Sequence, residues 1–99
     1  MTETIEKPIE DINIEFPKNW NVIYHNDNVT PFAYVVLSLA SIFGYQMEDA
    51  IKFAEKIEDE GKGVVGNYPK PIAEAKMNEV LEMNRRRGVN LEVTIEEEQ

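Results

Sequence analysis

The stretch Asn26-Asp27-Asn28-Val29-Thr30-Pro31 joins a strand-like run to an amphipathic helix, and the prediction of the fold starts from it. Thr30 is a residue type that favours the N-cap of a helix, and Pro31 suits the first helical position. The turn therefore predicts a helix that begins at Pro31. It also places one carboxylate and two carboxamides beside the free amides of a helix terminus, next to an apolar helix face. Such a turn can bind a small polar group that is attached to an apolar one.

Hydrophobic periodicity predicts the other elements on both sides of this turn. Glycines at the ends of the helical patterns, and alternation of apolar and polar residues near the C-terminus, set their limits. In chain order we expect a strand over 20–25, helices over 31–43 and 47–60, a strand over 63–68, a helix between Pro71 and Gly88, and a strand over 91–95. This β-α-α-β-α-β order predicts an α+β fold, a three-stranded sheet packed with three helices.

Length and composition predict one domain and limit its chemistry. The chain has 99 residues, which suffice for a single modest core, and we divide it into a flexible arm (1–18), a core domain (19–96) and an acidic tail (97–99). It has no cysteine, one histidine and a net charge of −9, so we expect no disulfide, metal or cofactor and no nucleic-acid partner. No apolar run is long enough to cross a membrane. We expect a cytoplasmic protein whose partners are proteins or peptides.

The turn and the helix after it resemble the N-D-D-x-T-P-x-x-x-V signature of the ClpS adaptors, with Val35 at the final position. The resemblance continues through Glu60-Gly61-Lys62-Gly63, the 66–68 strand, the 73–76 stretch and Leu91, and it spans residues 18–96. ClpS proteins bind the first residue of N-degron substrates and deliver these substrates to a Clp-type AAA+ protease. The resemblance thus implies two kinds of partner, the N-terminal peptides of substrates and an unfoldase of the ClpA or ClpC type.

The resemblance also implies roles for individual residues. Those expected to bind the substrate's α-amine are Asn26, Asp27 and Glu58. Those expected to line a pocket for a bulky apolar first side chain are Asn28, Thr30, Phe32, Val35, Ala54, Ile57 and Leu91. The matching A-E-x-K stretch makes Glu74 and Lys76 the expected protease contact.

This sequence departs from the family pattern at several of these positions. Glu58 stands where the family usually has a histidine, and an ionised glutamate can accept a hydrogen bond but cannot donate one. Phe32 and Ala54 stand where methionines are common, and their periodicity alone indicates ordinary helix packing. Asn28 replaces the usual second acidic residue. We expect Asp27 and Glu58 to repel each other and so to raise the pKa of at least one carboxyl group. The single histidine, His25, is expected at the surface, because neighbouring strand side chains point to opposite faces.

Three functions are alternatives to an N-degron adaptor. The first is a ClpS-like protein that has lost or altered N-degron recognition and modulates the Clp unfoldase. A carboxylate-based hydrolase using Asp27 and Glu58 ranks far below, since no nucleophile–base pair can be identified, and we expect no enzyme activity. The stretch from Gly61 to Gly66 matches G-x-G-x-x-G, but its glycines follow a helix and precede a strand. A dinucleotide site requires the reverse order, so we exclude nucleotide binding.

Overall fold

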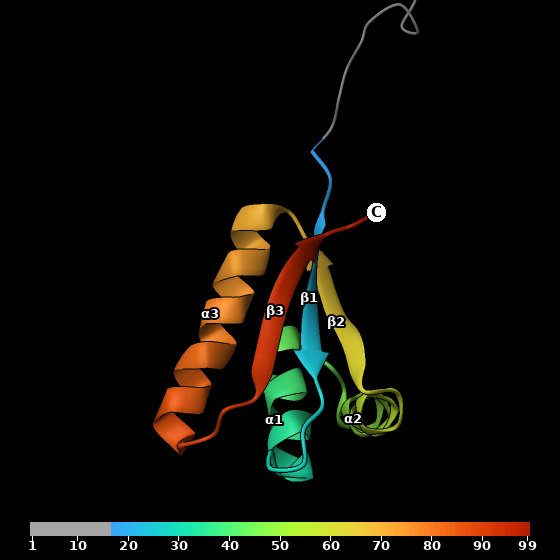
Figure 1. The fold of residues 1–99 in the computed structure, drawn as a ribbon, viewed down its shortest axis with the longest axis vertical. Coiled ribbons are helices and arrows are strands. Elements are labelled where there is room, and N and C mark those ends of the chain that lie inside the picture. Colours follow the sequence, from blue (N-terminus) through green and yellow to red (C-terminus); the bar gives the residue numbers. More distant parts are fainter. Residues whose placement is uncertain (1–16) are drawn as a thin grey trace, which may run out of the picture.

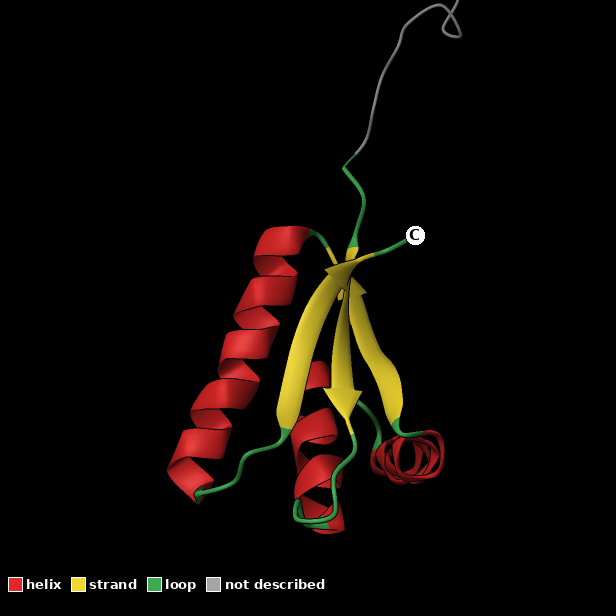
Figure 2. Ribbon diagram, viewed as in Figure 1, coloured by secondary structure: helices red, strands yellow, loops and turns green. Residues whose placement is uncertain are grey.

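The computed structural model describes residues 17–99, which form three helices and one three-stranded sheet (Figures 1 and 2). The elements are β1 (Trp20–His25), α1 (Phe32–Phe43), α2 (Met47–Glu60), β2 (Lys62–Tyr68), α3 (Lys70–Arg87) and β3 (Glu92–Glu97). Their order is the one predicted from the sequence, and the α+β prediction is confirmed. Most of the predicted arm, 1–18, lies outside the described residues and stays a prediction. Glu97, which we assigned to the acidic tail, is the last residue of β3.

The sheet has the strand order β2-β1-β3, and both pairings are antiparallel. Figure 1 shows α3 running alongside β3 and α1 lying behind the lower part of the sheet. Val22 and Tyr24 of β1 are fully buried, and they join Leu39 of α1 and Val80 of α3 in one core. The Tyr24 hydroxyl is 2.7 Å from Ser38 Oγ in the same region, so the polar atoms of this core are hydrogen-bonded. Within the described residues, no helix is both apolar and long enough to span a membrane.

Glycines end the helices as predicted. Gly44, Gly61 and Gly88 follow α1, α2 and α3 with φ values of 75°, 93° and 68°, a left-handed conformation that costs glycine little. Gly63 and Gly66 lie within β2. A Cβ at Gly66 would come within 2.5 Å of the Tyr68 ring, so close packing accounts for that glycine.

The start of α1 differs from the prediction. Pro31 occupies the N-cap position, helical residues begin at Phe32, and no side chain caps the helix. The Thr30 hydroxyl instead donates to Asp27 Oδ2 at 2.8 Å. A hydrogen bond to an ionised carboxylate is stronger than one between neutral groups, which explains why Thr30 bonds backward rather than capping α1.

Candidate functional site

The turn between β1 and α1 is organised around the carboxylate of Asp27. Its Oδ1 accepts hydrogen bonds from the backbone amides of Val29 at 2.8 Å and Thr30 at 2.6 Å, and its Oδ2 accepts from the Thr30 hydroxyl at 2.8 Å. These bonds, with the Thr30 amide contributing most, hold the pKa of Asp27 below its ordinary value. A carboxylate has about four acceptor sites, so roughly one, on Oδ2, stays available to a further donor.

The expectation of a raised pKa is therefore wrong for Asp27. It rested on repulsion between the Asp27 and Glu58 carboxylates. The three local hydrogen bonds stabilise the charged form of Asp27, and Glu58 is exposed to solvent, which weakens any repulsion. Asp27 is consequently a fixed negative charge at neutral and mildly acidic pH.

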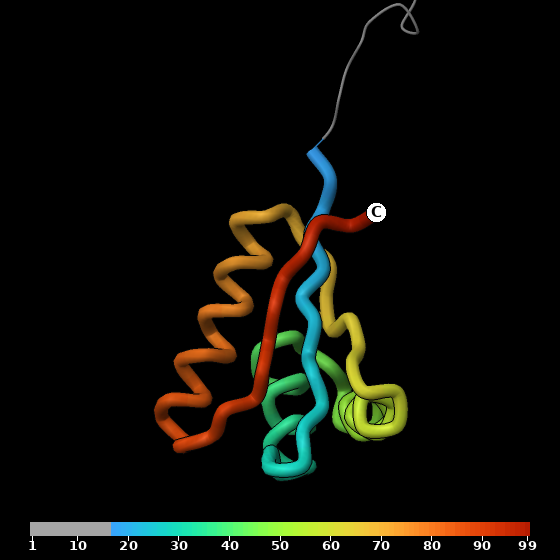
Figure 3. Tube along the Cα trace, in the orientation of Figure 1, coloured from blue at the N-terminus to red at the C-terminus, as the bar shows by residue number. Residues whose placement is uncertain are grey.

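A main-chain hydrogen bond connects this turn to the end of α2. The Asn26 amide donates to the Gly61 carbonyl at 2.8 Å, and Gly61 in turn ends α2 by donating to the Ile57 carbonyl at 2.8 Å. Figure 3 shows the turn and α2 at the same end of the sheet. Because Glu58 follows Ile57 in the last turn of α2, the two bonds bring Glu58 to the same cavity as Asn26 and Asp27.

Polar and apolar residues from five parts of the chain converge on this cavity. Polar groups lie on the turn and at the end of α2, and apolar side chains come from α1, from α2 and from the segment just before β3. The cavity is lined by His25, Asn26, Asp27, Thr30, Phe32, Val35, Ala54, Ile57, Glu58 and Leu91. The structure thus brings together every residue expected at the amine site or the pocket except Asn28.

Asn28 and His25 are the two differences between the predicted and the observed lining. Asn28 is exposed in the turn and does not border the cavity. The backbone of Val29 and Thr30 folds around the carboxylate of Asp27, and this leaves the Asn28 side chain facing solvent. His25 does border the cavity, at the end of β1, and its Nε2 lies 2.8 Å from Thr94 Oγ1. Strand alternation predicts only which face of the sheet a side chain points to. His25 borders the cavity because it is the last residue of β1.

The cavity is small in this structure. Its volume is about 30 Å³, roughly the share of one water molecule in the liquid. For comparison, an apolar cavity of about 150 Å³ can hold benzene. Phe32 is 38% exposed, whereas Ala54 and Leu91 are buried. A large apolar group does not fit this volume, so its entry requires lining residues to move, and Phe32 is the most exposed of the apolar ones.

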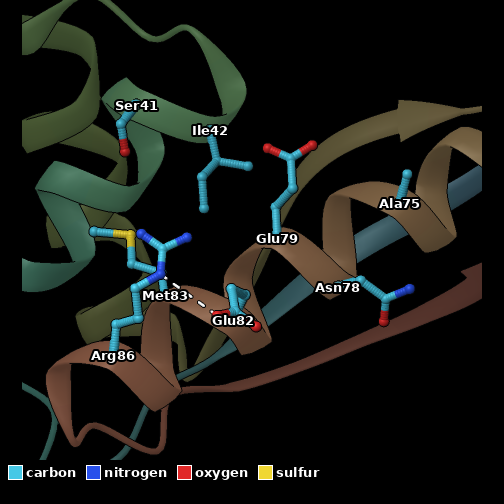
Figure 4. Close-up of a pocket in the computed structure, with 8 residues that line it drawn as sticks. All are labelled: Ser41, Ile42, Ala75, Asn78, Glu79, Glu82, Met83 and Arg86. Atoms are coloured by element: carbon cyan, nitrogen blue, oxygen red, sulfur yellow. Dashed lines mark hydrogen bonds and ion pairs between the residues drawn. The ribbon is translucent and has the colours of Figure 1, made fainter.

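A second, wider cavity lies between α1 and α3, with a volume of about 600 Å³ (Figure 4). Ile42 and Met83 provide its apolar surface, and Glu79 and Arg86 lie on α3 beside them. The Arg86 Nε atom is 3.4 Å from a Glu82 carboxylate oxygen, so the charge of Arg86 already has a partner. Lacking a turn with convergent acceptors, this groove is a weaker candidate for recognising a charged small group.

The two residues expected at the protease contact have different environments. Glu74 is exposed on α3. Lys76 is half-buried, and its Nζ donates to the Ile42 carbonyl at 2.8 Å while lying 5.9 Å from the centre of the Phe43 ring. Lys76 therefore stabilises the end of α1, a structural role that the sequence did not predict.

Comparison with known proteins identifies the family. The family model described as ATP-dependent Clp protease adaptor protein ClpS matches residues 15–94. The ClpS protein of Desulforapulum autotrophicum is 36% identical over 83 residues, covering 84% of this chain and 80% of that protein. The Neisseria meningitidis ClpS is 34% identical over 89 residues, covering 90% of this chain and 86% of that protein.

A solved structure agrees with these sequence matches. Agrobacterium tumefaciens ClpS2, bound to L-phenylalaninamide, superposes with a TM-score of 0.80 at 28% identity, covering 84% of this chain and 100% of that chain. The sequence matches and the structural match both cover most of the chain and agree on one family. The chain belongs to the ClpS family of Clp protease adaptor proteins.

Proposed function

We propose that this protein binds N-degron substrates, which carry a free α-amine and a bulky apolar first side chain, and delivers them to a Clp-type AAA+ protease in the cytoplasm. The observation that carries the proposal is the Asp27 carboxylate, fixed in its ionised form beside an apolar cavity. The Agrobacterium relative was solved with L-phenylalaninamide, a molecule with these two features. No step of this function requires a cofactor or a covalent reaction.

Three polar groups are suited to the α-amine. Asp27 has an acceptor site left on Oδ2, and a charge-assisted hydrogen bond to an ammonium group contributes about 1.5–3 kcal/mol. Glu58 adds a second carboxylate from α2. Within the described residues no hydrogen bond is found to the Asn26 side chain, so its amide can bond the substrate backbone and replace the carbonyl donor that Glu58 cannot provide.

The apolar part of the cavity is suited to the first side chain. Val35, Ile57 and Leu91 line it, together with the more exposed Phe32. Burying a Leu or Phe side chain contributes roughly 1.5–3 kcal/mol. Because lining residues have to move before a large side chain enters, part of this contribution offsets the cost of that movement.

Delivery to the protease would use surfaces away from the cavity. We propose Glu74 as a direct contact with a ClpA-like or ClpC-like unfoldase, and Lys76 as a residue that supports this surface through its bond to Ile42. We further propose that residues 1–18 are needed for delivery and not for peptide binding. Deleting them should leave peptide affinity unchanged and reduce the degradation of an N-degron reporter.

The small cavity favours one competing function. A ClpS-like protein with altered recognition would keep the unfoldase contact and modulate the unfoldase without accepting bulky first residues. The roughly 30 Å³ cavity and Glu58 in place of the family's usual histidine are both compatible with it.

Calorimetric titration with three small probes tests the proposal. L-phenylalaninamide carries both features, N-acetyl-L-phenylalaninamide lacks the charged amine, and L-alaninamide lacks the large side chain. We expect acetylation to weaken binding at least ~30-fold, corresponding to about 2 kcal/mol. Equal affinity for the free and acetylated amides, or no binding of either, would favour the competing function.

A further inference from the structure

A buried chain of hydrogen bonds connects α1, α3 and the wall of the cavity. The Tyr34 hydroxyl donates to Asn84 Oδ1 at 2.6 Å, and Asn84 Nδ2 donates to the Leu91 carbonyl at 2.9 Å. Asn84 is 6% exposed and Leu91 is 2% exposed, so neither bond competes with bulk water. These hydrogen bonds therefore join α1, which carries the lining residues Phe32 and Val35, to Leu91, which also lines the cavity.

The backbone of Asn84 is part of the same arrangement. Its carbonyl accepts from the Gly88 amide as the C-terminal cap of α3, and from the Val89 amide at 2.9 Å. The backbone and the side chain of Asn84 thus both form hydrogen bonds that fix the turn leading to Leu91. Residues 88–91 belong to no helix or strand, so these hydrogen bonds take the place of regular structure there.

Two open cavities border this turn. Gly88, Val89 and Asn90 border an open cavity of about 540 Å³ shared with the Asp27 turn, and also one of about 550 Å³ beside Leu81 and Arg85. Leu91 is buried in the core and Val89 packs against that core, so the hydrogen bond from Asn84 acts together with this packing to position the Leu91 backbone.

We propose that Asn84 is a positioning residue that sets the width of the first-residue pocket by holding Leu91 in place, and so determines which apolar side chains are accepted. The inference rests on the proposed function, which supplies the ligand. It goes beyond that function because neither Asn84 nor Tyr34 lines the cavity. With Leu91 held inward the pocket is narrow, which favours a leucine over a tryptophan as the first residue.

The size of the effect follows from the behaviour of apolar pockets. A misfit of about one methylene group changes discrimination roughly 10- to 200-fold. Releasing Leu91 should therefore change the ratio of affinities for two first residues, while the amine contacts of Asp27 stay the same. A general loss of stability would lower both affinities together and leave their ratio constant.

The experiment measures Kd for peptides that differ only in having Leu or Trp as the first residue. The variants are Asn84→Leu, which removes both side-chain bonds, and Tyr34→Phe, which removes one. The matched control is Tyr24→Phe, because Tyr24 also loses a buried hydroxyl hydrogen bond to α1, that to Ser38, but its hydroxyl takes no part in the chain of bonds from Tyr34 through Asn84 to Leu91. We expect Asn84→Leu to reduce the Leu-to-Trp preference about tenfold, Tyr34→Phe to reduce it less, and the control to leave it unchanged.

Amide hydrogen exchange gives a second readout that does not depend on peptide binding. In Asn84→Leu, exchange at residues 89–91 should accelerate more than exchange in β1. An unchanged affinity ratio together with unchanged exchange would overturn the inference while leaving the proposed function intact. If the wild-type protein binds neither peptide, the proposed function itself fails and the selectivity role of Asn84 fails with it.

Discussion

Replacing Asp27 with asparagine separates its charge from its role in folding the turn. Asparagine keeps an oxygen that can accept from the Val29 and Thr30 amides, and its NH₂ group can donate to the Thr30 hydroxyl, which then only has to rotate. The turn should therefore keep its shape. The negative charge that we propose binds the substrate's ammonium group is lost.

The expected loss of affinity follows from these contacts. A charge-assisted hydrogen bond contributes about 1.5–3 kcal/mol, corresponding to roughly 10- to 150-fold in Kd. Because Asp27 is only partly shielded from water, we expect the lower end of this range, about tenfold.

The assay is fluorescence polarisation with a labelled peptide that begins with an unblocked phenylalanine. Asp59→Asn provides the matched control, since Asp59 is an exposed acid on α2 that follows Glu58 but does not line the cavity. Thermal unfolding should show that both variants are folded at the temperature of the assay. The reasoning is refuted if Asp27→Asn binds like the wild type, or if Asp59→Asn loses as much affinity, which would indicate only a general effect of net charge.

Four further predictions follow from the same structure. The pKa of Asp27 is lower in the folded protein, so the ionised carboxylate stabilises the fold fully above the ordinary pKa near 3.8, and this stabilisation is lost as the pH falls through the folded pKa. The difference in unfolding midpoint between wild type and Asp27→Asn should therefore stay constant from pH 7 to 5 and shrink in that acidic range. Binding should weaken above about pH 8, where the substrate's α-amine loses its proton, which titrations at pH 7 and 9 would detect. Lys76→Met should lower the unfolding midpoint by roughly 4–8 °C because the Ile42 carbonyl loses its donor, whereas Lys70→Met, removing an exposed contact with an aromatic ring, should have less effect. Leu39→Asp should prevent folding, as judged by circular dichroism, because it places an unpaired charge at a fully buried position.

The sequence predicted the order of the elements because their signals are local. Helical spacing, the glycines at helix ends and strand alternation each depend on a few neighbouring residues. The same locality explains the error at the start of α1. Thr30 and Pro31 have favourable propensities for the N-cap and first helical positions, but Asp27, three residues earlier, binds the Thr30 hydroxyl and moves the helix start to Phe32.

The candidate site was largely anticipated through the resemblance, and the residues it missed depend on three-dimensional contacts. Asn28 matches the family signature but faces solvent, while His25 reaches the cavity because β1 ends there. Lys76 was expected only as a surface contact, since nothing local indicates that its side chain reaches the Ile42 carbonyl 34 residues away. Asn84 gave no sequence signal beyond its place on the apolar face of α3, because its partners come from α1 and from the turn before β3.

Nuclear Overhauser contacts between the ring protons of bound L-phenylalaninamide and the methyl groups of the protein test the central claim most directly. The account predicts contacts to Val35, Ile57 and Leu91, with the largest amide shifts in the turn around Asp27. Contacts to Ile42 and Met83 would instead place the ligand in the groove between α1 and α3 and contradict the account.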